Sequence, residues 1–368
     1  MTTTQRIFLQ FFQMALWGKS VEDFSWGDWE KIDWEGVADL VVVQTQVGLV
    51  VDVWAALPKE QRPPKSIYFG LLAMVADIEK DNKRMNALIP LLMTEFEKTG
   101  CKPWLLKGLA VGRLYRKPTL RQPGDIDLLL TNNEQYQLAK QLLEKLIGRE
   151  GKESAGRQHS EFWMNDILIE LHGAFSFMIC RRCTKHLPQW REKYMQEQPR
   201  RVQTKRGVAY LPPLQFEVVF VFAHMMNHLM TGGVGLRQVA DCMMLMYRCH
   251  DQIDVQQLQD ELNSLGLTKF WRVYAAMAVD FLGYPAERMP LYDVTFHHKG
   301  EKMLNLIFKT GNFGHLQKEK QLSSDANKWL KKLVTAWGQV PVYWHAGKIF
   351  PWDALYCFWK YSMSVLMG

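Results

Sequence analysis

The chain has 368 residues, more than the roughly 250–300 at which a single hydrophobic core stops growing. It is 48% hydrophobic and 23% charged, which is too apolar for a disordered protein, and we expect two or three packed units. The net charge of +7 is mildly basic. It suits a polyanion or a nucleoside triphosphate, although a surplus of this size can also serve solubility alone.

Neither a membrane span nor a disulfide framework is expected. The sequence contains no run of eighteen uninterrupted apolar residues; the two longest candidates are broken by charges such as Asp39 and Lys360. No small-residue cleavage site follows the first apolar segment, which ends at Trp17, so we interpret it as an amphipathic helix rather than a signal peptide. The six cysteines are irregularly scattered. Together these features predict a cytoplasmic protein with no membrane partner.

Residues 1–100 are expected to form a helical N-terminal region. An apolar-rich stretch at positions 37–57 ends before Pro58, and a second periodic segment spans positions 67–96 with Pro90 inside it. Apolar residues that recur at helical spacing over such lengths indicate amphipathic helices. The first hundred residues therefore predict helices and no strands.

The pattern changes at Cys101, where short apolar runs separated by Gly, Pro and Asn begin. Such punctuation is typical of strands and turns. We expect a strand at positions 104–106, then a helix, a strand at positions 126–130, and a second helix capped by Asn132. Residues 101–212 are thus predicted to form a core in which strands and helices alternate.

A β-hairpin is predicted around Asn165-Asp166. These residue types tolerate positive φ and suit a two-residue turn, and predicted strands flank them at positions 160–164 and 167–171. Residues 213–368 are predicted to form a helical C-terminal region. The expected fold is therefore α+β, a small mixed-sheet core flanked by helical N- and C-terminal regions.

Three carboxylates carry the chemistry that the sequence predicts. Asp125 and Asp127 are two residues apart, so in a strand their side chains face the same side. Two carboxylates so close repel each other unless cations lie between them, and oxygen ligands suit Mg²⁺ or Mn²⁺. Glu170 lies on a later predicted strand and is the expected third ligand. Three carboxylates can hold two metal ions, which is the arrangement used for in-line displacement at phosphorus.

Four residues around the carboxylates are candidates for binding the nucleotide. Gly108 follows a predicted strand, and a turn without a side chain lets the backbone approach phosphate. Lys107 and Arg121 are placed to neutralise phosphate charge, and Gly124 directly precedes the aspartates. Alternatively, Lys107 is an ordinary solvated or ion-paired lysine, and Arg121 forms an ion pair.

The segments Leu106-Lys107-Gly108, Gly124-Asp125-Ile126-Asp127 and Ile169-Glu170-Leu171-His172 together resemble an uncharacterised nucleotidyltransferase family of the DNA polymerase β-like superfamily. The resemblance covers residues 100–175 and implies Mg²⁺-dependent transfer of a nucleoside monophosphate from ATP or another triphosphate. It implies that Asp125, Asp127 and Glu170 are the metal ligands and that Gly108 lies under the triphosphate. Small molecules, RNA and proteins are all modified on such cores, and the sequence selects neither the acceptor nor an oligomeric state.

Five further residues are candidates for the acceptor side of the site. His224 and His228 are four apart and share one face of a predicted helix. Arg237 and Asp241 follow on the next predicted helix, where they would otherwise form an ordinary i, i+4 ion pair. His172 shares a strand face with Glu170, and its alternative is a histidine packed against the sheet.

Two alternatives to catalysis remain at this point. Leu109 follows Gly108 where the superfamily usually has Ser or Gly, which favours a catalytically weak or inactive nucleotide-binding or interaction module, similar to half of a toxin–antitoxin pair. Cys180, Cys183 and the nearby His186 have zinc-ligand spacing and would instead predict a zinc-stabilised helical protein. No second Cys-x-x-Cys motif occurs to complete four ligands.

Overall fold

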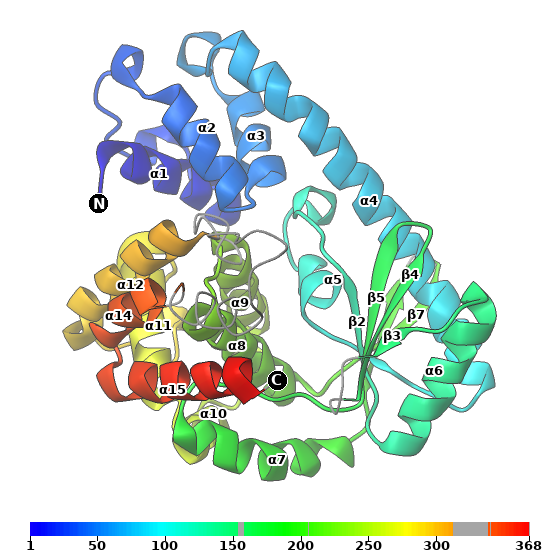
Figure 1. The fold of residues 1–368 in the computed structure, drawn as a ribbon. Coiled ribbons are helices and arrows are strands. Elements are labelled where there is room, and N and C mark those ends of the chain that lie inside the picture. The colour runs from blue at the N-terminus through cyan, green and yellow to red at the C-terminus, as the bar shows by residue number, and fades with distance from the viewer. Residues whose placement is uncertain (154–157, 205, 312–337, 339, 368) are drawn as a thin grey trace, which may run out of the picture.

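The computed structural model describes residues 1–153, 158–204, 206–311, 338 and 340–367. Its N-terminal helices are α1 (Thr3–Trp17), α2 (Trp34–Val43), α3 (Val47–Ala56) and α4 (Lys65–Lys98). The apolar stretch 37–57 is divided between α2 and α3, because the chain turns at Thr45, where φ is 55°. In Figure 1 the long α4 runs from the first three helices to the edge of the sheet.

The middle of the chain supplies the strands. In chain order its elements are β1 (Trp104–Leu105), α5 (Lys107–Gly112), the short 3-10 helix η4 (Pro118–Leu120), β2 (Ile126–Leu129), α6 (Asn133–Ile147), β3 (Lys152–Glu153), β4 (His159–Met164), β5 (Ile167–His172), α7 (Arg181–Met195), β6 (Arg200–Thr204) and β7 (Gly207–Leu211). Asn132 caps α6, as predicted, by accepting a hydrogen bond from the Gln135 amide. The hairpin of β6 and β7 was not predicted.

The main sheet has the strand order β1-β2-β5-β4-β3 (Figure 1). The strands β2 and β5 are parallel, whereas the other neighbours are antiparallel. Asn165 and Asp166 have φ values of 50° and 63°, which allow the predicted two-residue turn between β4 and β5. The predicted α+β fold with a small mixed sheet is confirmed.

The C-terminal part is helical in the residues that are described. Its helices are α8 (Leu214–Thr231), α9 (Leu236–Cys249), α10 (Val255–Leu265), α11 (Thr268–Leu282), α12 (His297–Thr310), α14 (Val340–Gly347) and α15 (Pro351–Met367). Residues 312–337 of the predicted helical region lie outside the described residues. Within the described ranges, the apolar stretches of the helices are too short to cross a membrane.

Two hydrophobic clusters organise the molecule. One joins the N-terminal helices to the C-terminal helices α8–α12. The other packs the apolar face of the sheet against α6 and the second half of α4. The predicted division at residues 100 and 212 stays a prediction, but helices from both ends of the chain share one core. The polar face of the sheet is left to border the C-terminal helices.

Candidate metal and nucleotide site

Asp125, Asp127 and Glu170 meet on the polar face of the sheet. Asp127 on β2 is the register partner of Glu170 on the parallel strand β5, and Asp125 directly precedes β2. Ligand oxygens of the three carboxylates lie within 4.8 Å of one another. Asp127 is 1% exposed. Its Oδ2 atom is buried with no hydrogen-bond partner in the described part of the chain, which is costly for a charged oxygen and fits a cation ligand.

The three carboxylates experience different electrostatic environments. Burial, and then repulsion by Asp127, raises the pKa of Asp125 to about 6 although Lys107 opposes the shift. Burial works against the charge of Glu170, but hydrogen bonds from His159 and His172 hold the pKa of this carboxyl below its usual range. A cation would relieve the repulsion that acts on Asp125.

Lys107 lies against Asp127. Its Nζ atom is 2.7 Å from Asp127 Oδ1, and although burial disfavours its charge, attraction to Asp127 raises the pKa of Lys107. The backbone turns sharply here, because Lys107 has a φ of 37° and Gly108 is non-helical within α5. A Cβ atom at Gly108 would lie 3.8 Å from the Asp125 carbonyl oxygen. The turn therefore lies beside the Asp125 backbone, while contact with phosphate stays a prediction.

Arg121 and Asp241 form a buried ion pair. Arg121 Nε and Nη2 donate to the two carboxylate oxygens of Asp241 at 2.7 and 2.5 Å. The Tyr115 hydroxyl donates to the same carboxylate at 2.8 Å. Arg121 thus ties the loop before Asp125 to α9. The predicted contacts of Arg121 with the nucleotide and of Asp241 with the acceptor stay predictions.

The start of α9 also holds this loop. Arg237 Nη1 donates to the carbonyl oxygens of Gln122 and Pro123 at 3.2 and 2.9 Å. A Cβ atom on Gly124 would lie 3.7 Å from the same nitrogen. Arg237 and Asp241 were alternatively expected to form an i, i+4 ion pair with each other. Their hydrogen bonds instead join each of them to the loop 121–124.

His224 and His228 on α8 face each other, with their Nε2 atoms 3.2 Å apart. Burial, and then the positive charge of Lys107, lowers the pKa of His228 to about 4. The same two causes lower the pKa of His224 well below its usual range. Two neutral imidazoles thus lie within the electrostatic reach of Lys107, while their role toward an acceptor stays a prediction.

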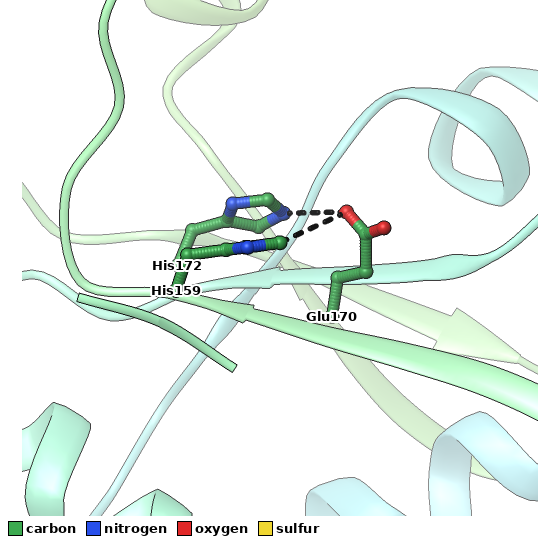
Figure 2. Close-up of side chains that lie close together, drawn as sticks. All are labelled: His159, Glu170 and His172. Carbon is green, nitrogen blue, oxygen red and sulfur yellow. Dashed lines mark ion pairs between the residues drawn. The ribbon is translucent and has the colours of Figure 1, made fainter. Parts of the chain in front are cut away.

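His159 belongs to the site, although sequence reasoning missed it. Its Nε2 atom is 3.4 Å from Glu170 Oε2, and its ring stacks on that of His172 with centroids 4.8 Å apart (Figure 2). His172 Nε2 is 2.9 Å from Asp127 Oδ1. The signal was available, because pairing the residues outward from the Asn165-Asp166 turn places position 159 opposite position 172.

The cysteine motif begins a helix. Cys180 is the N-cap of α7, and its Sγ atom accepts a hydrogen bond from the Cys183 amide at 3.3 Å. All six cysteines are free and buried. Among the described residues, the clusters with metal-ligand geometry are Asp125-Asp127-Glu170 and His159-Glu170-His172, and neither contains a cysteine. The thiols therefore have a capping and packing role in this structure.

Comparison with known proteins identifies the family. The sequence model described as "Uncharacterised nucleotidyltransferase" matches residues 30–283, which is more than half of the chain. No curated protein and no solved structure gives a significant match. The match spans the carboxylates, the Lys107-Gly108 turn, and helices α8 and α9, which contact the site. This chain belongs to the uncharacterised nucleotidyltransferase family.

Proposed function

We propose that the protein transfers a nucleoside monophosphate from a nucleoside triphosphate to an acceptor in a reaction that depends on Mg²⁺ or Mn²⁺. The observation that carries the proposal is the unpartnered Oδ2 atom of buried Asp127, within a group of three carboxylates. Membership of a nucleotidyltransferase family supports the reaction class. The metal, the triphosphate and the acceptor are the proposed part.

In this proposal Asp125, Asp127 and Glu170 hold the cations. Divalent ions held there would supply positive charge for the displacement at phosphorus. The parallel strands β2 and β5 fix Asp127 and Glu170 relative to each other. Hydrogen bonds from α4 and α9 hold the loop that carries Asp125 in place. Both supports are rigid elements, as a preorganised site requires.

Lys107 and Gly108 are assigned to the triphosphate. The Lys107 ammonium lies 2.7 Å from Asp127 Oδ1 on a flexible four-carbon side chain, so it is placed to contact a phosphate bound beside the carboxylates. Gly108 leaves the turn open toward the Asp125 backbone. His224 and His228 are assigned to the acceptor side, because a neutral imidazole can accept a proton from an acceptor hydroxyl.

The test is incubation of the purified protein with each labelled triphosphate and Mg²⁺ or Mn²⁺, followed by measurement of pyrophosphate and of any labelled product, including the protein itself. Asp127→Asn preserves the side-chain shape and removes the charge, and it should abolish pyrophosphate release. Glu161→Gln is the matched control, because Glu161 lies on the same sheet face but pairs with Lys152. Equal pyrophosphate release by Asp127→Asn and the wild type would refute the proposal.

A second candidate is an inactive nucleotide-binding module. It is favoured by the Lys107 ammonium and His172, which both lie within hydrogen-bond distance of Asp127 Oδ1 and already compensate its charge. Metal-dependent binding of a triphosphate without pyrophosphate release, under all conditions tried, would select this candidate.

A further inference from the structure

His159, Glu170 and His172 form a second group with metal-ligand geometry (Figure 2), which shares Glu170 with the group of three carboxylates. The two imidazoles come from register partners on the antiparallel strands β4 and β5. Both present Nε2 to the same atom, Glu170 Oε2, at 3.4 Å. The ligand atoms of the group lie within 4.8 Å of one another.

The two N···O distances are long for hydrogen bonds and leave room for shared coordination of one ion. Each distance is 3.4 Å, whereas N–H···O hydrogen bonds centre near about 2.9–3.0 Å. Two ligands of a tetrahedral ion at about 2.1 Å lie about 3.4 Å apart. Adjacent ligands of an octahedral Mg²⁺ ion, also at about 2.1 Å, lie about 3.0 Å apart. The two N···O separations are therefore closer to those of a tetrahedral ion than to those of an octahedral one.

The group is rigid and open to solvent. Hydrogen bonds between β4 and β5 fix its three backbone positions in one sheet. The side chains of His159, Glu170 and His172 remain 19%, 18% and 15% exposed, so an ion can reach them. The ligand types also differ from those of the neighbouring group, because imidazole nitrogen suits Zn²⁺, Fe²⁺ or Cu²⁺, whereas Mg²⁺ and Mn²⁺ prefer oxygen.

We propose that His159, Glu170 and His172 bind a divalent transition-metal ion in preference to Mg²⁺, beside the all-carboxylate group and with Glu170 common to both. Two adjacent cations of different chemistry would then share one carboxylate. The pairing with a Mg²⁺ site rests on the proposed function, whereas binding at the two histidines does not require any turnover.

The test uses the full chain, stripped with a chelator and titrated with Co²⁺, whose visible absorption reports nitrogen ligands and tetrahedral geometry. His159→Ala removes one ligand of this group and leaves in place Lys107 and His172, which contact Asp127. Glu161→Gln is the control on the same strand and face. His186→Ala controls for the loss of an imidazole and probes the Cys180-Cys183 motif at the same time.

The wild type, Glu161→Gln and His186→Ala should bind one nitrogen-coordinated Co²⁺ ion, and a large excess of Mg²⁺ should not displace it. His159→Ala should bind this ion at least about tenfold more weakly. Unchanged affinity in His159→Ala, loss of the ion in His186→Ala, or displacement by equimolar Mg²⁺ would each overturn the proposal.

Two further measurements test metal binding in ways that do not depend on the folding of the His159→Ala variant or on any catalytic activity. In the wild type, electron spin-echo spectra of bound Cu²⁺, an ion that imidazole suits, should show coupling to imidazole nitrogen, and its absence would contradict the proposal without any variant. Asp125→Asn should retain the Co²⁺ absorption, because Asp125 lies outside this group. A wild type that releases no pyrophosphate but shows the Co²⁺ spectrum would refute the proposed function alone.

Discussion

Replacing Asp241 with alanine should strongly destabilise the protein, because it leaves the Arg121 guanidinium buried without its counter-ion. The side chains of the pair are only 5% and 6% exposed. Arg121 makes two hydrogen bonds to Asp241, at 2.7 and 2.5 Å, and the Tyr115 hydroxyl also loses its acceptor. Removing one partner of a buried pair costs about 3–5 kcal/mol, so we expect the free energy of unfolding to fall by at least about 3 kcal/mol.

A second ion pair, between Lys117 and Asp52, supplies a matched control. Lys117 contacts Asp52 at 2.6 Å, a comparable distance, but these side chains are 61% and 36% exposed. Asp52→Ala should therefore cost no more than about 1 kcal/mol. Urea unfolding, followed by tryptophan fluorescence and circular dichroism, measures both losses. If Asp241→Ala and Asp52→Ala had equal urea midpoints, burial would not determine how much these ion pairs stabilise the protein.

A double replacement separates the lost pair from the abandoned charge. Arg121→Met with Asp241→Leu removes both charges and fills similar volume, an exchange that is often neutral or stabilising at buried pairs. The double variant should recover most of the stability that Asp241→Ala loses. A double variant less stable than Asp241→Ala would show that the pair itself, rather than the unpaired guanidinium, dominates the effect.

Three further predictions concern the site, the packing and the pH dependence. Asp127→Asn should lower pyrophosphate release at least about 100-fold, the effect of removing one group that stabilises transition-state charge, and chelation should abolish release until Mg²⁺ is restored. Gly48→Ala should lower the free energy of unfolding by about 1–3 kcal/mol, because its Cβ would lie 2.2 Å from the Leu120 carbonyl oxygen. The control is Gly70→Ala in α4, whose Cβ would meet nothing within 4 Å. Equal unfolding midpoints of the two variants would contradict the prediction. Burial raises the pKa of Glu217 above its ordinary value of 4.5, although Arg200 opposes the shift, so the folded state binds this proton more tightly than the unfolded state. The free energy of unfolding of the wild type, measured relative to that of Glu217→Gln, should therefore fall as the pH rises above 4.5. A difference between the two proteins that does not depend on pH would refute this prediction.

Local patterns in the sequence predicted the elements that present the site. Alternating apolar residues beside Asn165-Asp166 are enough to predict the β4–β5 hairpin, since turn type and register are both local. The same register places His159 opposite His172, so that pairing was predictable even though it was missed. Asn132 was likewise predictable as a helix cap, because capping depends only on the adjacent residues.

Contacts between distant segments were not predictable in the same way. The pairing of Arg121 with Asp241 joins residues 120 positions apart, and no periodicity or spacing marks it. Within a helix, Arg237 and Asp241 have the spacing of a local pair, yet each instead contacts the loop before Asp125. That Glu170 lies beside Asp127 depends on the parallel pairing of β2 with β5, which neither strand encodes alone.

Helices from both the N-terminal and the C-terminal part of the chain help to position Asp125, and they do so through the loop 121–124. Asp125 lies before β2, so the sheet hydrogen bonds that fix Asp127 do not include it. Instead, Asn82 of α4 donates to the Arg121 carbonyl oxygen at 2.8 Å, and Arg237 of α9 donates to the Pro123 carbonyl oxygen at 2.9 Å. The position of Asp125 therefore depends on helices that lie outside the predicted core, and both helices lie within the residues 30–283 that the family model matches. A core consisting of residues 101–212 alone would lose both helices that position the third carboxylate.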